Sequence, residues 1–130
     1  MQSRDPAIHT VLTSDDVLGP SSGGTAWTTK KFHDANPKRY RAVLDAMQEA
    51  SVFIAGHPKE TVAFYAADTK IKIDTDMMKK LLADPRFKYA MTSRATLRWA
   101  DFMHKGGASR WRQASWKDLI WPEIYDLDGG

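Results

Sequence analysis

The sequence has 130 residues, 42% of them hydrophobic and 27% charged, which excludes wholesale disorder and predicts one folded domain with an apolar core. Its 19 basic and 16 acidic residues give a net charge of +3 but are mixed along the chain, so they do not favour a nucleic-acid binder. The absence of cysteine excludes disulfides, thiol catalysis and thiolate metal sites.

The sequence predicts neither a membrane span nor a secretory signal. No stretch approaches the ~20 consecutive apolar residues that a transmembrane helix needs. Residues 1–6 also lack the apolar core of a signal peptide. Two localisations stay open on this evidence: a cytoplasmic chain, or a fragment whose export signal lies elsewhere.

The first part of the chain predicts two short strands around a flexible crossing. Residues 8–13 form a β-prone run that ends at the turn former Ser14-Asp15-Asp16. Residues 19–24 are rich in glycine and serine and suit a linker, a hinge or a loop that approaches a ligand. Residues 25–29 are the second candidate strand.

From residue 30 onward the pattern becomes helical. Residues 30–35 predict a short helix, and Asn36 as N-cap with Pro37 at the first helical position predicts the start of a longer one. Gly56 is a fitting stop for this helix. Its apolar face is predicted from helical spacing to consist of Tyr40, Val43, Leu44, Met47, Ala50 and Ile54.

Further elements alternate between helices and brief extended stretches. Helices are predicted over 57–68, from Asp74 or Thr75 to 82, and from a Thr92-Ser93 cap to Gly106-Gly107. Residues 71–73 and 87–91 are expected to be extended. Ser115 and Asp118 resemble a capping box and predict one last helical turn.

No constellation of catalytic or metal-binding residues is present. The four histidines lack paired spacing, so no metal is predicted. The carboxylate pairs at 15–16 and 74–76 are explained by turns and helix starts. Ser21 and Ser22 lack a nucleophile motif and a nearby base, so we expect no catalytic residue and no cofactor. The loop that carries them suits a polar or anionic ligand, or is a plain linker.

Three of the five tryptophans, Trp111, Trp116 and Trp121, recur near the C-terminus. Exposed tryptophans can stack on nucleobases or insert at a membrane interface, so both roles are alternatives here. Five-residue spacing does not keep one helix face, so we expect Trp116 and Trp121 to hold the final turn against the helical body.

Several stretches, taken together, resemble substrate-binding proteins of ABC importers for nitrate, sulfonate, taurine and related compounds. They are residues 14–22 with 28–37, residues 40–50, and residues 100–106 with 115–124. The resemblance implies an α/β fold of the type II periplasmic-binding-protein kind. This chain, mostly helical with a few short strands, would form an incomplete lobe. Residues 1–20 would end the second lobe and return through the hinge, and residues 21–130 would form the helical C-terminal part of the first lobe.

The same resemblance implies a function without catalysis. The chain would capture a small polar or anionic ligand by hinge closure and present it to a membrane permease, in the periplasm or at an extracytoplasmic lipid anchor. Ser21 and Ser22 would contact the ligand at the hinge, with Trp27 as a further contact. Gly23-Gly24 departs from the bulkier residues of the family pattern.

Two other functions and one assembly stay open at this stage. The first is a small basic helical nucleic-acid-binding domain that uses the Arg110-Trp111-Arg112 triplet. The second is an enzyme with Asp15, Asp16 and His33 as acid–base groups. Exposed edges and an uncovered lobe face would also invite two copies of the chain to pair as a homodimer.

Overall fold

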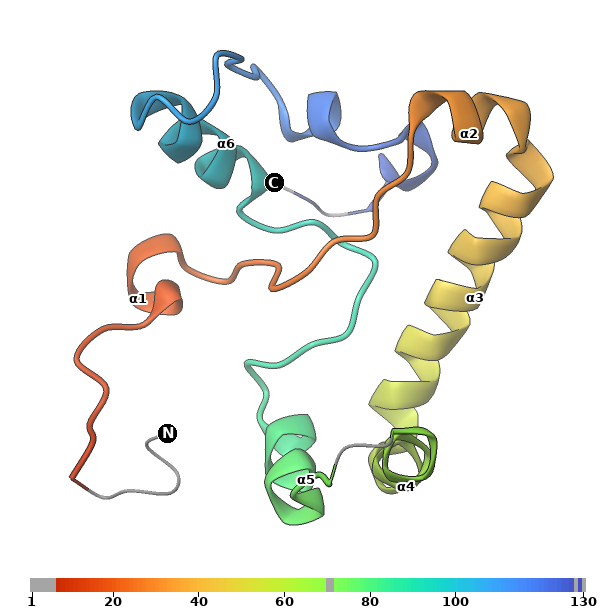
Figure 1. The fold of residues 1–130 in the computed structure, drawn as a ribbon, viewed down its shortest axis with the longest axis vertical. Helices are drawn as coiled ribbons and strands as arrows, with labels where there is room; N and C mark the ends of the chain where they lie inside the picture. The colour runs from red at the N-terminus through yellow and green to blue at the C-terminus, as the bar shows by residue number, and fades with distance from the viewer. Residues whose placement is uncertain (1–6, 70–71, 128, 130) are drawn as a thin grey trace. The chain divides into compact units, whose positions relative to one another are not determined.

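The structure is a computed structural model that describes residues 7–69, 72–127 and 129, and these residues form helices and irregular segments (Figure 1). The elements are, in order, α1 (Ser14–Leu18), α2 (Lys30–Ala35), α3 (Pro37–Gly56), α4 (Pro58–Asp68), α5 (Thr75–Ala83), α6 (Thr96–Lys105) and the 3-10 helices η1 (Trp116–Leu119) and η2 (Pro122–Ile124).

The chain divides into two compact units. The terminal unit combines the residues up to Thr25 with those from Thr92 onward, and the middle unit runs from Ala26 to Met91. The terminal unit therefore holds α1, α6, η1 and η2, whereas the middle unit holds α2 to α5. The sequence predicted a boundary at residue 20 between parts of two lobes. The two units of this chain do not test that prediction.

The expected α/β fold is wrong. None of the residues that the structure describes lies in a β-strand, and the candidate strands at 8–13, 25–29 and 87–91 contain no strand. A β-prone run becomes a strand only when a second strand satisfies its backbone groups, and propensity alone cannot supply that partner. The stretch expected to be extended at 71–73 begins outside the described residues.

The first helix replaces the turn expected at Ser14-Asp15-Asp16. Thr13 precedes α1 in an extended conformation, and its hydroxyl accepts a hydrogen bond from Asp16 N–H at 3.2 Å. The Asp16 carboxylate accepts one from Thr13 N–H at 2.8 Å. This reciprocal capping box satisfies two backbone donors and converts the acidic turn into one helical turn.

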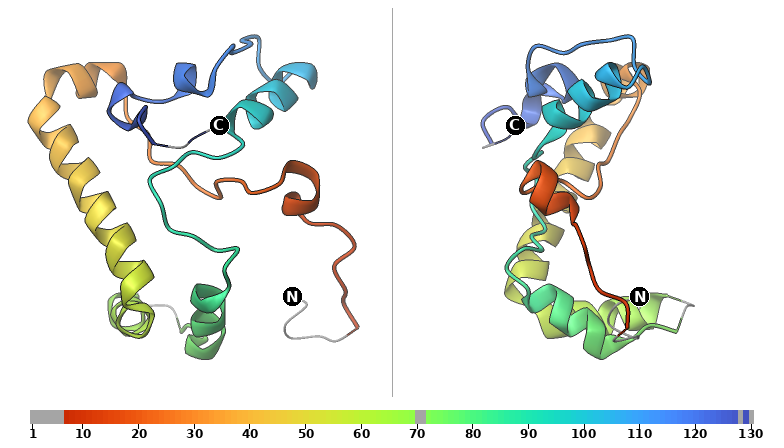
Figure 2. Two further views of the ribbon diagram at one scale, coloured as in Figure 1. Left: turned by 180° about the vertical axis from the view of Figure 1, so that it is seen from behind. Right: turned by 90° about the vertical axis from the view of Figure 1, so that its left-hand side faces the viewer.

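The middle unit confirms the helices expected at 30–35, 37–56 and 57–68. Pro37 and Pro58 occupy the first turns of α3 and α4, where the missing N–H costs no helical hydrogen bond. Asn36 precedes α3 as expected but does not cap it with its side chain; its Nδ2 donates to Phe32 O at 3.1 Å. The chain bends sharply there in both views (Figures 1 and 2). Figure 1 looks along α4 while α3 is seen from the side, so the two helices cross steeply.

Helix α5 begins at Asp74, the first of its two candidate caps. The Asp74 carboxylate accepts hydrogen bonds from Asp76 N–H at 3.2 Å and from Met77 N–H at 3.0 Å. Asp84 closes the helix and forms a short turn with Arg86, whose guanidinium lies 2.6 Å from the carboxylate. An aspartate side chain therefore caps the start of α5, whereas at its end Asp84 bonds Leu81 O through its backbone N–H and Arg86 through its side chain.

Helix α6 starts later than expected because Thr92 and Ser93 are used elsewhere. Its N-cap is Ala95, which has a left-handed backbone (φ 57°) and is buried. The Ser93 hydroxyl contacts the Thr96 hydroxyl instead of capping a helix. The end of α6 is as predicted, since Gly106 is its C-cap and Gly107 follows with a positive φ of 74°.

The C-terminal segment confirms the predicted capping box, and Trp116 makes a ring contact within the segment itself. The expectation that Trp116 and Trp121 hold the final turn against the helical body stays a prediction. Ser115 accepts from Lys117 N–H at 3.2 Å, and Asp118 accepts from Ser115 N–H at 3.0 Å. The ring of Trp116 meets Tyr125 edge-on at 6.3 Å between centroids. Tyr125 in turn donates its hydroxyl proton to Lys117 O at 2.7 Å. These contacts tie η1 to the residues after η2.

The described residues bury very little. Only Val62, Ala95 and Ser93 are less than 9% exposed, at 3%, 3% and 8%. The chain leaves 10841 Å² accessible, whereas a compact monomer of its mass exposes about 6,900 Å². Two separate compact units of half that mass would together expose about 8,400 Å² by the same relation. The chain therefore leaves more surface accessible than two compact units of its mass would.

Candidate functional site

The terminal unit contains an open cavity of about 680 Å³ beside α6. Its lining residues are Leu97, Arg98 and Asp101 from α6, and Arg112, Gln113 and Ala114 from the segment that follows. We call this the arginine pocket. Two guanidinium groups and one carboxylate therefore border a space large enough for a small polar molecule.

Hydrogen bonds before α6 fix the position of the helix in the unit. Ser22 N–H donates to Arg94 O at 3.1 Å, and the Ser22 hydroxyl accepts from Arg94 N–H at 3.0 Å. The same hydroxyl lies 3.5 Å from Thr92 O. Arg98 then donates from Nη1 to Leu18 O, which joins the pocket wall to the end of α1. One of the five donors of Arg98 is thus structural.

The turn after α6 brings residue 112 back to the helix. Ala108 N–H and Ser109 N–H both donate to Met103 O, at 2.9 and 3.1 Å. His104 Nδ1 lies 3.1 Å from Ser109 O, and because a carbonyl only accepts, that nitrogen carries the proton. These bonds close the turn around Gly106 and Gly107, so the following segment forms the second wall of the pocket.

The carboxylate of the pocket is already occupied by cations. Lys105 Nζ lies 2.6 Å from Asp101 Oδ2, and Arg112 Nε lies 3.9 Å from Asp101 Oδ1. The hydrogen bond from Lys105 lowers the pKa of Asp101, and the charges of Lys105, Arg112 and His104 act in the same direction. Lys105 and Arg112 around one carboxylate, with Arg98 in the same lining, leave the pocket with excess positive charge, which suits an anionic ligand.

The three residues predicted to contact a ligand, Ser21, Ser22 and Trp27, do not line the arginine pocket. Ser21 and Ser22 are half-buried at the segment that pairs with residues 92–94, and the Ser22 hydroxyl serves that pairing. Trp27 belongs to the middle unit and is 85% exposed. No observation on these residues tests a ligand contact, so their role stays a prediction.

The sequence analysis did not predict the residues of the arginine pocket, although their spacing contains a signal. Arg98, Asp101 and Lys105 are spaced i, i+3 and i+7, which places them on one face of a helix. Arg112 is 14 residues after Arg98, and only the turn at Gly106-Gly107 explains how it reaches that face. Among the described residues no group of three His, Cys, Asp or Glu side chains could hold a metal ion.

The geometry defines an open cavity with an excess of cationic side chains beside α6. Comparison with known proteins adds a relative. The chain is 33% identical over 114 residues to GTP 3',8-cyclase 1 of Mycobacterium tuberculosis, in both strain CDC 1551 / Oshkosh and strain ATCC 25618 / H37Rv. The match covers 83% of the chain but 30% of the relative, so the chain spans less than a third of the proteins it resembles. No protein-family model matches the sequence. No solved structure matches it either.

This similarity corrects the functional expectations. The relatives are cyclases, so the assignment to the solute-binding proteins of ABC importers is wrong, and with it the transport function. The expectation that the chain is no enzyme is contradicted by its similarity to enzymes. The alternative of a nucleic-acid-binding domain likewise has no counterpart in the names of these relatives.

The physical reason for the error lies in the matched fragments. The Asn36-Pro37 start and the Ser115–Asp118 capping box are local signals for the beginning of a helix. Such signals recur wherever helices begin, whatever the protein does. The permease partner and the extracytoplasmic location rest on the same resemblance and stay untested. In the part of the chain that the structure describes, no helix has both the length and the apolarity needed to cross a membrane.

Proposed function

We propose that the chain is part of a GTP-processing enzyme and that its arginine pocket binds the phosphates of GTP or a closely related nucleotide. The observation that carries the proposal is the similarity of most of the chain to GTP 3',8-cyclase 1, a protein named for its action on GTP. The chain has no cysteine and shows no nucleophile paired with a base, so its contribution would be binding rather than bond making.

The chemistry of the pocket supports this role. A triphosphate carries several negative charges on oxygens that match the planar fork of a guanidinium. Arg112 and the donors of Arg98 that Leu18 O does not use border the pocket. Lys105 compensates the nearby Asp101, so the carboxylate repels an incoming phosphate less than it would alone. Because Arg112 is exposed, binding should weaken as salt screens the charges.

Titration calorimetry of the 130-residue chain with GTP, GDP and guanosine tests the proposal. We expect GTP to bind more tightly than GDP, and guanosine to bind weakest, because the phosphates supply the contacts. Arg112→Gln should weaken GTP binding at least about tenfold, since a charge-assisted hydrogen bond contributes about 1.5–3 kcal/mol and each 1.4 kcal/mol is about tenfold in affinity.

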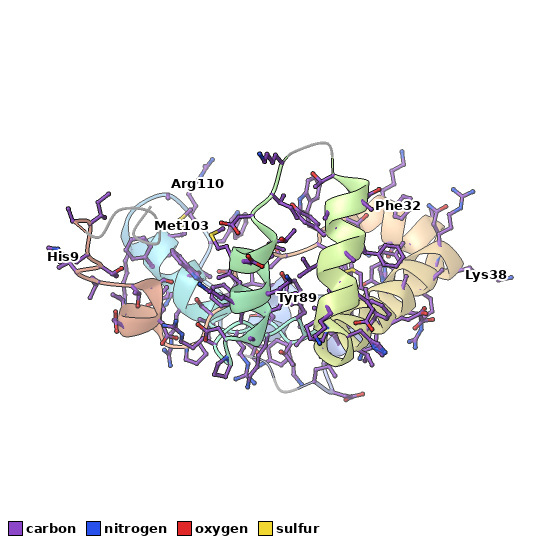
Figure 3. The ribbon with its side chains drawn as sticks, turned by 90° about the horizontal axis from the view of Figure 1, so that it is seen from below. His9, Phe32, Lys38, Tyr89, Met103 and Arg110 are labelled. Carbon is purple, nitrogen blue, oxygen red and sulfur yellow. The ribbon has the colours of Figure 1, made fainter. Side chains whose placement is uncertain are left out.

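Arg110→Gln is the matched control, because it removes the same charge two residues away from a side chain that does not line the pocket. Arg110 extends away from the ribbon in Figure 3. Equal losses in the two variants would indicate a diffuse charge effect and reject the pocket. Guanosine binding as tightly as GTP, or no binding of GTP at millimolar concentration, would reject the phosphate-binding role.

A further inference from the structure

The arginine pocket contains one acidic side chain, which the binding of phosphates does not require. Asp101 lines the cavity together with Arg98 and Arg112. The hydrogen bond that Asp101 accepts from Lys105 lowers the pKa of its carboxyl group, so the side chain is ionised at neutral pH. A negative charge weakens a phosphate site, whereas an ionised carboxylate is a strong acceptor for hydrogen-bond donors. Asp101 therefore suits a part of the ligand that carries donors.

Most of the hydrogen-bonding capacity of this carboxylate is left over after its contacts with the described residues. Lys105 Nζ lies 2.6 Å from Asp101 Oδ2, whereas Arg112 Nε lies 3.9 Å from Oδ1, which is beyond hydrogen-bond distance. An ionised carboxylate can accept about four hydrogen bonds, two on each oxygen. Both oxygens can therefore accept a further bond. The side chain is 34% exposed, so a ligand in the cavity can reach it.

Guanine presents the donors that a carboxylate accepts. Its Watson–Crick edge carries N1–H and the 2-amino group side by side, so the two oxygens of one carboxylate can accept both at once. Adenine has an unprotonated N1 and no 2-amino group, so the same carboxylate would face a lone pair and gain no bond. A carboxylate in a nucleotide pocket can therefore distinguish guanine from adenine, which arginines that hold phosphates cannot do.

The two arginines leave room for this contact. Arg112 is 74% exposed and not hydrogen-bonded to Asp101, so its guanidinium can turn toward the phosphates when a base takes its place at the carboxylate. Arg98 lies one turn before Asp101 on α6, and the donors that Leu18 O does not use remain for a phosphate. The cavity of about 680 Å³ has the size of a small-molecule site. One pocket can thus offer an acceptor to the base and donors to the phosphates.

We propose that Asp101 binds the guanine base of the nucleotide, its carboxylate accepting hydrogen bonds from N1–H and from the 2-amino group. The proposal rests on the nucleotide-binding role proposed above and adds base specificity to it. Lys105 is then a positioning residue, because its ammonium group holds Oδ2 and keeps the carboxylate ionised.

Titration calorimetry of the 130-residue chain with triphosphates of different bases tests the proposal without any variant. Inosine triphosphate (ITP) lacks the 2-amino group and ATP lacks both donors, while all three nucleotides carry the same phosphates. We expect GTP to bind at least about tenfold more tightly than ITP, because ITP lacks one hydrogen bond to a charged group, and ATP to bind weakest. Equal dissociation constants for GTP, ITP and ATP would overturn the guanine contact, and tripolyphosphate binding would then leave the phosphate-binding role standing.

Asp101→Asn should exchange the base preference. The amide keeps an acceptor for N1–H but presents a donor to the 2-amino group, whereas the 2-oxo group of xanthosine triphosphate (XTP) accepts that donor. The variant should therefore bind XTP more tightly than GTP, and its preference for GTP over ITP should disappear. Asp126→Asn removes the same charge from the same unit outside the pocket lining, and it should leave every ratio between nucleotides unchanged.

These ratios separate a base contact from a charge effect. Loss of a negative charge alone would tighten GTP, ITP and XTP alike without changing any ratio, and that result for Asp101→Asn would overturn the proposal. Circular dichroism verifies that the variant keeps its helices; if it does not fold, the wild-type comparison of GTP, ITP and ATP decides. Failure of the phosphate-binding role looks different, because guanosine would then bind as tightly as GTP and would still be preferred to inosine.

Discussion

At the scale of single residues, Gly19 shows how one backbone conformation ends a helix. It has φ 68° and ψ −165°, in a region that only glycine adopts readily, and its N–H donates to Asp15 O at 2.8 Å. Gly19→Ala should lower the free energy of unfolding by about 1–3 kcal/mol through backbone strain. A Cβ there would meet Arg98 Nη1 at an ordinary 3.6 Å, so steric conflict adds little. Urea denaturation followed by tryptophan fluorescence measures the effect.

The control for Gly19 is Gly23, which has open space where a Cβ would lie and no positive φ. Gly23→Ala should leave stability unchanged or raise it by up to about 1 kcal/mol, because alanine restricts the unfolded chain. Equal destabilisation by the two substitutions would show that the backbone conformation at Gly19 is not the cause.

A second residue-scale prediction concerns the turn after α5. The Arg86 side chain and backbone N–H donate to Asp84, and these hydrogen bonds lower the pKa of Asp84 from 3.8 to about 2. A lowered pKa means that the interaction stabilises the turn above about pH 4 and is lost as the pH falls toward 2. Carboxyl NMR should give a pKa near 2, rising toward 3.8 in Arg86→Gln.

Lys88→Gln removes a charge from the same segment without touching the Asp84 hydrogen bonds that the structure shows, and it should leave the Asp84 pKa near 2. If Arg86→Gln left that pKa unchanged as well, the carboxylate would owe its low pKa to something other than Arg86.

At the scale of helices, α5 depends on one capping side chain. Asp74 accepts two backbone N–H donors, whereas Asp76 in the same turn only pairs with Lys79 at 3.0 Å. Asp74→Ala should destabilise α5 by about 0.5–2 kcal/mol, and Asp76→Ala by a few tenths, since an exposed i,i+3 pair contributes little. Amide hydrogen exchange across α5 measures both. Similar acceleration in the two variants would contradict the capping role.

Helix positions were also what the sequence predicted best. The starts at Pro37 and Pro58 and the cap at Ser115 follow from local chemistry, which one sequence contains. The start of α6 could not be predicted, because Ala95 caps it in a left-handed conformation that only the surrounding contacts hold. The arginine pocket was missed for a similar reason. Arg98 and Arg112 become neighbours through a turn whose path no local pattern specifies.

At the scale of the whole molecule, the large accessible surface should be visible in its unfolding. A compact chain of 14.7 kDa removes about 14,400 Å² from water on folding, while this chain, with 10841 Å² still accessible, removes about 10,500 Å². The urea m-value scales with the area exposed on unfolding. The monomer should therefore unfold with an m-value about three-quarters of that for a compact domain of equal length.

Urea titrations followed by tryptophan fluorescence and by circular dichroism measure this slope. An m-value equal to that of a compact domain of the same length would show that the chain already buries a complete core.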